Sequence, residues 1–139
     1  MVARVRLVLL TIAVLAAPFQ SLRAENLEHV QLLRKTGKCP SCDLSSANLP
    51  GLISPEADLR NADLNYAVLY KVRLNKANLT GATLKGANLS GADLTGANLT
   101  GADFSGANLR GSIGARLLKA TTDTTTTCPG GENGPCVVK

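Results

Sequence analysis

The chain has 139 residues, which is enough for one domain. Aromatic residues make up 3% of it and tryptophan is missing, which argues against a thick globular core because large rings normally supply much of the area buried in one. Without its first 24 residues the chain holds 12 basic and 10 acidic side chains, and this near balance argues against a nucleic-acid-binding surface.

Residues 1–24 have the composition of a secretory signal peptide. Arg4 and Arg6 precede an apolar run over 7–17 that is interrupted only by Thr11, and Ala24 supplies a small residue for cleavage. The run is shorter than the roughly 20 apolar residues of a membrane-spanning helix. We expect cleavage after Ala24 and an exported mature chain, with a retained N-terminal anchor as the alternative.

The next segment, residues 25–41, is predicted to be a capping helix followed by a CxxC turn. Apolar residues recur near helical spacing at Leu27, Val30 and Leu33. Glu25 or Asn26 can cap the start of this helix, and Gly37 can end it. The single histidine, His29, has no partner at metal-ligand spacing, so we expect an ordinary surface or packing residue.

From residue 42 to residue 111 the sequence repeats every five residues. Thirteen of fourteen repeat centres are leucine or phenylalanine, and Ser54 is the exception; the thirteen are Leu44, Leu49, Leu59, Leu64, Leu69, Leu74, Leu79, Leu84, Leu89, Leu94, Leu99, Phe104 and Leu109. Alanine stands two residues before the centre in eleven repeats, and glycine follows the centre at the same distance in most later ones. A period of five fits neither a helix nor a flat strand. It predicts short extended pieces with two inward side chains, joined by turns, four to a coil of about twenty residues.

This A(D/N)LXX series resembles the pentapeptide-repeat family over residues 42–111, about half of the chain. The resemblance implies an all-β fold, a right-handed quadrilateral β-helix of about 3.5 coils, but no particular activity. As in other solenoids, the ends need caps, and residues 112–139 are expected to form the C-terminal cap or tail. Both flanks resemble exported members from cyanobacteria and chloroplast lumens, which implies the periplasm or the thylakoid lumen, with secretion as the alternative.

Four cysteines form two pairs in the sequence, Cys39 with Cys42 and Cys128 with Cys136, one outside each end of the repeats. In an exported protein an even number of cysteines indicates disulfides. Redox activity of the Cys39-Pro40-Ser41-Cys42 motif and free thiols are the alternatives. A single zinc site is excluded, because about 17 Å of stacked coils would separate the pairs.

No catalytic, cofactor-binding or metal-binding constellation stands out, and the common catalytic and nucleotide-binding motifs are absent from the sequence. Asp43, Asp63 and Asp103 are predicted to share one face because they are separated by multiples of twenty. They occupy the position where asparagine substitutes freely in other repeats, so we expect them to form turns rather than to catalyse.

The least regular stretch, residues 60–76, replaces corner glycines with larger side chains. It gathers six residues that we consider a possible partner-binding patch: Arg60, Tyr66, Tyr70, Lys71, Arg73 and Lys76. The alternative is that these are drifted repeats with a solvated basic face.

We therefore expect an exported, non-catalytic scaffold or protein-interaction module that binds an unknown protein partner, as a monomer or an end-to-end dimer. No cofactor, nucleic acid or membrane association after cleavage is expected. Regulation of a topoisomerase by DNA mimicry is one alternative, although it requires an acidic, cytoplasmic chain. Thiol–disulfide exchange through the CPSC motif is the other.

Overall fold

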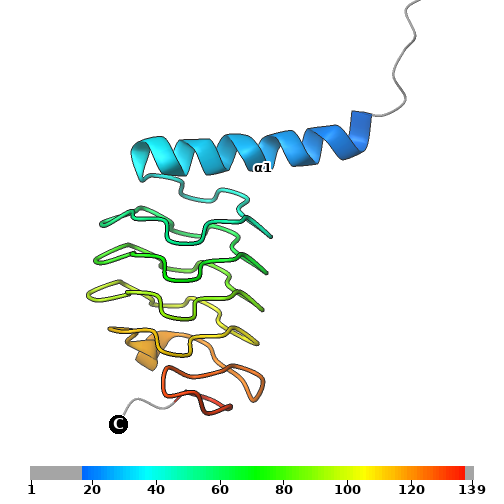
Figure 1. Ribbon diagram of the computed structural model, residues 1–139. Coiled ribbons are helices and arrows are strands. Elements are labelled where there is room, and N and C mark those ends of the chain that lie inside the picture. Colours follow the sequence, from blue (N-terminus) through cyan, green and yellow to red (C-terminus); the bar gives the residue numbers. More distant parts are fainter. Residues whose placement is uncertain (1–16, 137–139) are drawn as a thin grey trace, which may run out of the picture.

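A computed structural model describes residues 17–136 of the chain and the side chains of residues 26–136. A single long helix, α1 (Ala17–Thr36), lies across one end of a stack of coils, and a short 3-10 helix, η1 (Leu117–Lys119), interrupts the last coil (Figure 1). Most of the expected signal peptide, residues 1–16, lies outside the described residues.

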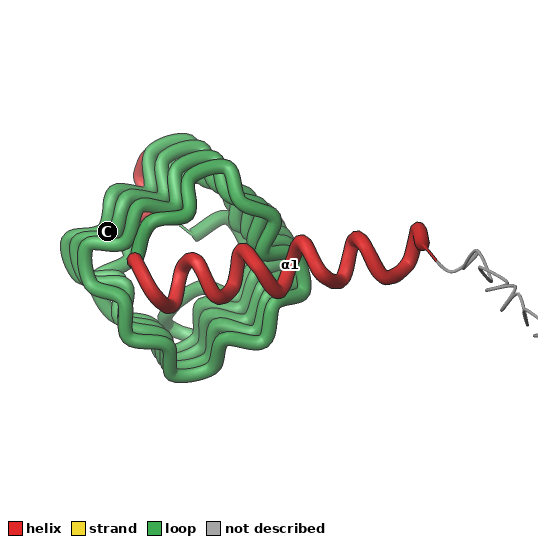
Figure 2. Tube along the Cα trace, turned by 90° about the horizontal axis from the view of Figure 1, so that it is seen from above, coloured by secondary structure: helices red, strands yellow, loops and turns green. Residues whose placement is uncertain are grey.

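The coils pair through parallel backbone bridges between residues twenty apart, such as Asp43 with Asp63 and Asp63 with Thr83. Twenty residues correspond to four pentapeptides, and the coils have a four-sided outline when the stack is viewed along its axis (Figure 2). Each side is too short to form an extended strand, so the pairing consists of single bridges rather than long ladders.

Each regular corner of the coils is a tight turn. At the corner after Leu64, the carbonyl oxygen of Leu64 accepts a hydrogen bond of 3.1 Å from the Ala67 N–H, and Tyr66 has a φ of 59°. A positive φ at the third residue is the pattern of a type II turn, which favours glycine there and proline one residue earlier. Pro50 and Gly51 show this combination directly.

The core is one continuous column of small and branched side chains. All thirteen leucine and phenylalanine centres are at most 3% exposed, as the five-residue period predicts. The alanines two residues earlier fill the space between them, and of these only Ala97 is not fully buried. Ser54 is also buried, so the centre that breaks the leucine series still points inward.

Helix α1 begins at Ala17, so the prediction that it starts at Glu25 is wrong. Pro18 lies in the first turn of α1, where proline is tolerated because its missing N–H would have no helical partner there. The expected cleavage site after Ala24 therefore falls within α1. The C-terminal end matches the expectation: Gly37 has a φ of 67°, and its N–H donates to the Leu33 carbonyl at 2.8 Å.

The face by which α1 contacts the first coil matches the prediction in part, because Val30 and Leu33 pack against the core whereas Leu27 does not. Leu33 is 1% exposed, but Leu27, expected on the same face, is 59% exposed. The Asn26 side chain does not cap the helix; its Nδ2 donates to the Ser45 carbonyl at 3.0 Å. His29 Nδ1 lies 3.1 Å from both the backbone nitrogen and the carbonyl oxygen of Asp43. Polar side chains therefore carry much of this contact, because the coil presents backbone groups at its open end.

The backbone pairing extends beyond the predicted limits of 42 and 111. It begins at Lys38, which pairs with Asp58, and reaches Thr127, which pairs with Asn108. The last coil is irregular: eight residues separate Ile113 from Thr121, whereas ten separate their partners Asp93 and Asp103. The residues predicted to form only a cap therefore also complete part of the solenoid. Within residues 17–136, no helix is long and apolar enough to cross a bilayer.

Candidate protein-interaction surface

The coil register places the six predicted patch residues on different sides of the stack. Arg60 lies on the side centred on Leu59, where it makes a bidentate ion pair with Asp58 at 2.8 and 2.7 Å. Lys76 lies at the corner after Leu74, with its Nζ 3.8 Å from Glu56 Oε1. These two cations do not belong to one patch with the others.

The remaining four predicted residues follow one another around one side, its two corners and the start of the next side. Tyr66 lies at the corner before the side centred on Leu69, Tyr70 on that side, and Lys71 and Arg73 at and beyond the next corner. All four are exposed. The Lys71 Nζ lies 5.1 Å from the centroid of the Tyr70 ring, a cation–π distance.

Two apolar residues that the sequence analysis did not single out belong to the same surface. Val68 lies between Tyr66 and Tyr70 and is 38% exposed, whereas asparagine occupies the equivalent position in the coils on both sides, at Asn48 and Asn88. Ile53 pairs by its backbone with Arg73 and is 64% exposed. The sequence feature that could have identified both residues is an aliphatic side chain directly before the repeat centre, where most repeats have asparagine or aspartate. We call this set the Tyr70 surface: Ile53, Tyr66, Val68, Tyr70, Lys71 and Arg73.

The Tyr66 ring is held by the next coil. A Cβ atom at Gly86 would lie 2.8 Å from two carbons of this ring, so the ring lies directly against the glycine. Lys71 covers Gly91 in the same way, since its Cγ would lie 3.2 Å from a Cβ there. Both side chains therefore lie over a glycine of the next coil while remaining exposed.

The aspartate column has a structural role. Asp43, Asp63 and Asp103 are stacked in register through bridges that also include Thr83. Each Oδ1 accepts a hydrogen bond of 2.9 Å from the backbone N–H two residues later. The hydroxyl groups of Ser45 and Ser105 lower the pKa of Asp43 and Asp103 respectively, which favours the charged acceptor over a proton donor.

The structure joins the cysteines as Cys39–Cys42 and Cys128–Cys136, with Cα–Cα distances of 5.3 and 5.4 Å. Cys39 is fully buried and Cys42 is 6% exposed, so both sulfur atoms of the CPSC motif are enclosed. Thiol–disulfide exchange requires access to a sulfur atom, so this enclosure disfavours a redox role. Among the described residues, no group of three or more potential ligands could hold a metal ion.

Comparison with known proteins identifies the family of the five-residue repeat. The family model for pentapeptide repeats matches residues 41–81 and 77–113 with eight copies. A search of curated proteins gives no match.

Solved structures of pentapeptide-repeat proteins are similar to the chain. HetL from the cyanobacterium Nostoc is 30% identical over 69% of this chain and 55% of its own, so the match spans about half of HetL, with a TM-score of 0.44. Rfr23 from the cyanobacterium Cyanothece is 28% identical over 76% of this chain and 99% of its own, with a TM-score of 0.28. A protein of the Arabidopsis thaliana thylakoid lumen is 26% identical over 66% of this chain and 61% of its own, with a TM-score of 0.31.

Proposed function

The chain belongs to the pentapeptide-repeat family, and on this premise we propose that it is an exported, non-catalytic scaffold that binds a protein partner through the Tyr70 surface. The right-handed sense of the coils and the capping role of α1 are part of the same proposal. Members of this family are often interaction modules.

The observation that carries the proposal is the clustering of exposed apolar side chains. Four large hydrophobic residues that are at least 38% exposed, Ile53, Tyr66, Val68 and Tyr70, lie on this one surface. Exposed apolar residues scattered singly need no explanation, but a cluster flanked by cations is typical of a binding surface. Tyrosine and arginine are also the residues that most often dominate binding energy at interfaces.

Export is supported by the pattern of residues 1–24, and the described contacts of α1 are compatible with cleavage after Ala24. Among the side chains that the structure describes, those of Asn26, His29, Val30 and Leu33 contact the coils, and all four follow the expected cleavage site. Removal of residues 1–24 would leave these contacts in place. Two disulfides suit the oxidising conditions of the periplasm or the thylakoid lumen.

The test is affinity capture from the native exported fraction with a variant that restores the regular repeat. Val68→Asn, Tyr70→Ser and Lys71→Gly together introduce the residues that stand twenty positions later, Asn88, Ser90 and Gly91, so the fold should persist. We expect this triple variant to lose a protein that the wild type captures. The control Thr80→Ser, on the side centred on Leu79, should retain it.

Binding of the purified partner should weaken by roughly tenfold or more, since losing a single interface hot spot costs at least about 2 kcal/mol. Equal capture by the wild type and the triple variant would show that the Tyr70 surface is not the binding site.

A further inference from the structure

Within residues 17–136, the backbone pairing of the stack is interrupted without a side-chain substitute on the side centred on Leu99. One coil earlier, Lys76 N–H donates to the Thr95 carbonyl at 2.8 Å, and Leu79 N–H donates to the Asn98 carbonyl at 2.9 Å. The equivalent donors in the next coil are Gly96 N–H and Leu99 N–H. The Ala97 carbonyl is equivalent to the Ala77 carbonyl twenty residues earlier, which accepts a hydrogen bond within the stack. Within residues 17–136, none of these three groups has a hydrogen-bond partner.

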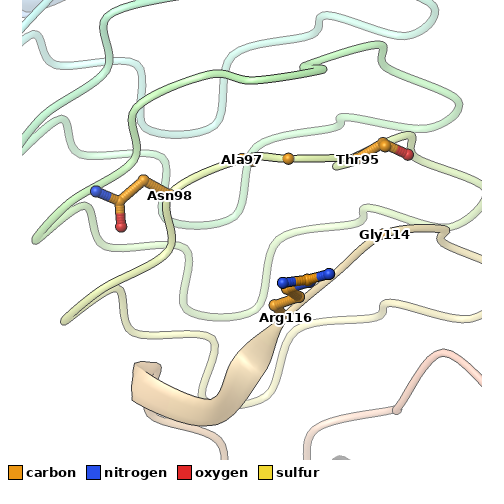
Figure 3. Close-up of a pocket in the computed structure, with 6 residues that line it drawn as sticks. Thr95, Ala97, Asn98, Gly114 and Arg116 are labelled. Atoms are coloured by element: carbon orange, nitrogen blue, oxygen red, sulfur yellow. The ribbon is translucent and has the colours of Figure 1, made fainter.

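The interruption arises because the chain takes a shorter path beneath this side. Leu94 N–H still donates to the Ile113 carbonyl at 2.9 Å, and Gly101 N–H donates to the Lys119 carbonyl at 2.7 Å. Between these points Gly114 lies directly against Thr95, so close that a side chain on Gly114 would collide with the Thr95 backbone. The chain then turns away into η1 (Figure 3). The segment below the 96–99 edge therefore does not run parallel to it.

Two adjoining hollows lie along this open edge. One is lined by Thr95, Gly96, Ala97, Asn98, Gly114 and Arg116. The other continues along 97–100 toward Arg116, Leu118 and Lys119. The hollows share Ala97, Asn98 and Arg116, so they form one groove that follows the unpaired backbone, with the Arg116 side chain standing in it (Figure 3).

The groove is rich in hydrogen-bond donors and positive charge. Arg116 and Lys119 are exposed, and neither makes an ion pair within the described part of the chain. The Asn98 Oδ1 accepts a hydrogen bond of 3.1 Å from the Thr100 N–H, which leaves the Asn98 amide nitrogen available to donate. Leu118, 81% exposed, supplies an apolar contact at one end. This chemistry complements a segment that offers carbonyl and carboxylate oxygens.

We propose that this open edge binds an extended, acidic peptide segment of a partner protein by strand addition. Two carbonyl groups of the segment accept from Gly96 N–H and Leu99 N–H, and one of its N–H groups donates to the Ala97 carbonyl. A carboxylate of the segment lies against Arg116. Strand addition of this kind takes its affinity from main-chain hydrogen bonds and its specificity from side-chain contacts. The inference rests on the proposed role as an interaction module but uses a different surface.

The test uses the full mature chain and capped synthetic peptides. The probe is acetyl-Ala-Asp-Leu-Thr-amide, and the controls are the same peptide with lysine in place of aspartate and the same peptide with N-methylated backbone nitrogens. In the free protein we expect the amide protons of Gly96 and Leu99 to exchange rapidly, while those of Lys76 and Leu79 are protected. The acidic peptide should slow exchange at Gly96 and Leu99 specifically.

We expect the acidic peptide to bind at least about tenfold more tightly than the lysine peptide, because its carboxylate makes a charge-assisted hydrogen bond to Arg116 that the lysine side chain cannot make. The Arg116→Glu variant should remove this preference. The Arg73→Glu variant should keep the preference for the acidic peptide, but it should weaken partner capture by the Tyr70 surface. Failure of one proposal is therefore distinguishable from failure of the other.

Three outcomes would overturn the inference. The first is protection of Gly96 and Leu99 in the free protein at low concentration. The second is equal binding of the acidic, lysine and N-methylated peptides. The third is protection that appears with rising protein concentration and no peptide, which would identify a second copy of the chain as the occupant.

Discussion

At each regular corner from Ser41 to Gly111 one residue has the left-handed backbone conformation, and the two halves of the solenoid fill that position differently. From Gly81 to Gly111 it is glycine, with φ between 63° and 72°. In the earlier coils it is mostly occupied by residues with side chains, at φ between 54° and 59°: Ser41, Ser46, Glu56, Asn61, Tyr66, Lys71 and Lys76. The left-handed conformation costs an L-residue about 1–2 kcal/mol, so the early corners retain strain that glycine would remove.

Glycine at such a corner should therefore stabilise the protein. Glu56 has a φ of 59°, and its ion pair with Lys76 is too exposed to contribute much. We expect Glu56→Gly to raise the free energy of unfolding by about 0.5–1 kcal/mol, because the relief of strain exceeds the entropy that glycine adds to the unfolded chain. Thermal or denaturant unfolding measures this change.

Replacing a corner glycine with alanine should cost more stability where a side chain of the neighbouring coil lies over that glycine. Gly86→Ala combines a φ of 63° with a contact against the Tyr66 ring, and we expect it to lose about 2–3 kcal/mol. Gly51→Ala has a similar φ but open space around its Cβ, so it should lose only about 1 kcal/mol. Equal losses in the two variants would contradict the packing of Tyr66 on Gly86.

Among the elements, the two ends of the stack are closed by different means. Helix α1 covers the first coil with Leu33 and with hydrogen bonds from Asn26 to backbone carbonyls. The last coil is closed by a loop around Asp123, whose Oδ1 accepts from the N–H of Gly106 at 3.1 Å and of Thr125 at 2.9 Å. The loop therefore depends on one carboxylate.

This dependence predicts a response to acid. The Thr125 hydroxyl and the surrounding N–H groups lower the pKa of Asp123 to about 2 from an ordinary value of 3.8. Because the pKa is lower in the folded state, the stabilisation is present above pH 3.8 and disappears as the pH falls through 2. We expect the melting temperature of the wild type to fall more steeply between pH 5 and pH 2 than that of Asp123→Asn, which does not titrate.

Asp123→Asn should also be the less stable of the two proteins at pH 6, since a neutral oxygen is a weaker acceptor. The other aspartates titrate in both proteins, so the difference between the curves isolates Asp123. Parallel curves would show that this carboxylate does not hold the loop.

For the whole molecule, the stack separates the two cysteine pairs, which lie at its opposite ends (Figure 1). Mass mapping of protein from an oxidising compartment should therefore find Cys39–Cys42 and Cys128–Cys136, with no cross-linkage between the pairs. A cross-pair would require Cα atoms within about 7 Å.

Reduction should lower the thermal stability while the coils persist in the circular dichroism spectrum, because the bridges between residues 58 and 113 depend on neither disulfide. Closing the 128–136 loop contributes roughly 2–3 kcal/mol by the chain-entropy argument. A thiol–disulfide enzyme would instead reduce insulin and lose this activity in Cys39→Ser. We expect no such activity.

The sequence by itself determined which residues point inward. Each pentapeptide repeats the same local conformation, so a leucine centre and an alanine two residues earlier are buried wherever they occur, from Leu44 to Leu109. The turns follow from the same local rule, since asparagine and aspartate bond the N–H two residues later. The helix end at Gly37 is local as well.

Only the tertiary structure decided which exposed residues are neighbours. Closure of the coil every twenty residues separates Arg60 and Lys76 from Tyr70 and brings Ile53 beside Arg73. The face of α1 is set by backbone groups of the first coil, which favour Asn26 and His29 over Leu27. The open edge at Gly96 exists because Gly114 meets Thr95 and the chain then leaves the register. These outcomes depend on contacts between residues far apart in the sequence, and a five-residue pattern does not encode them.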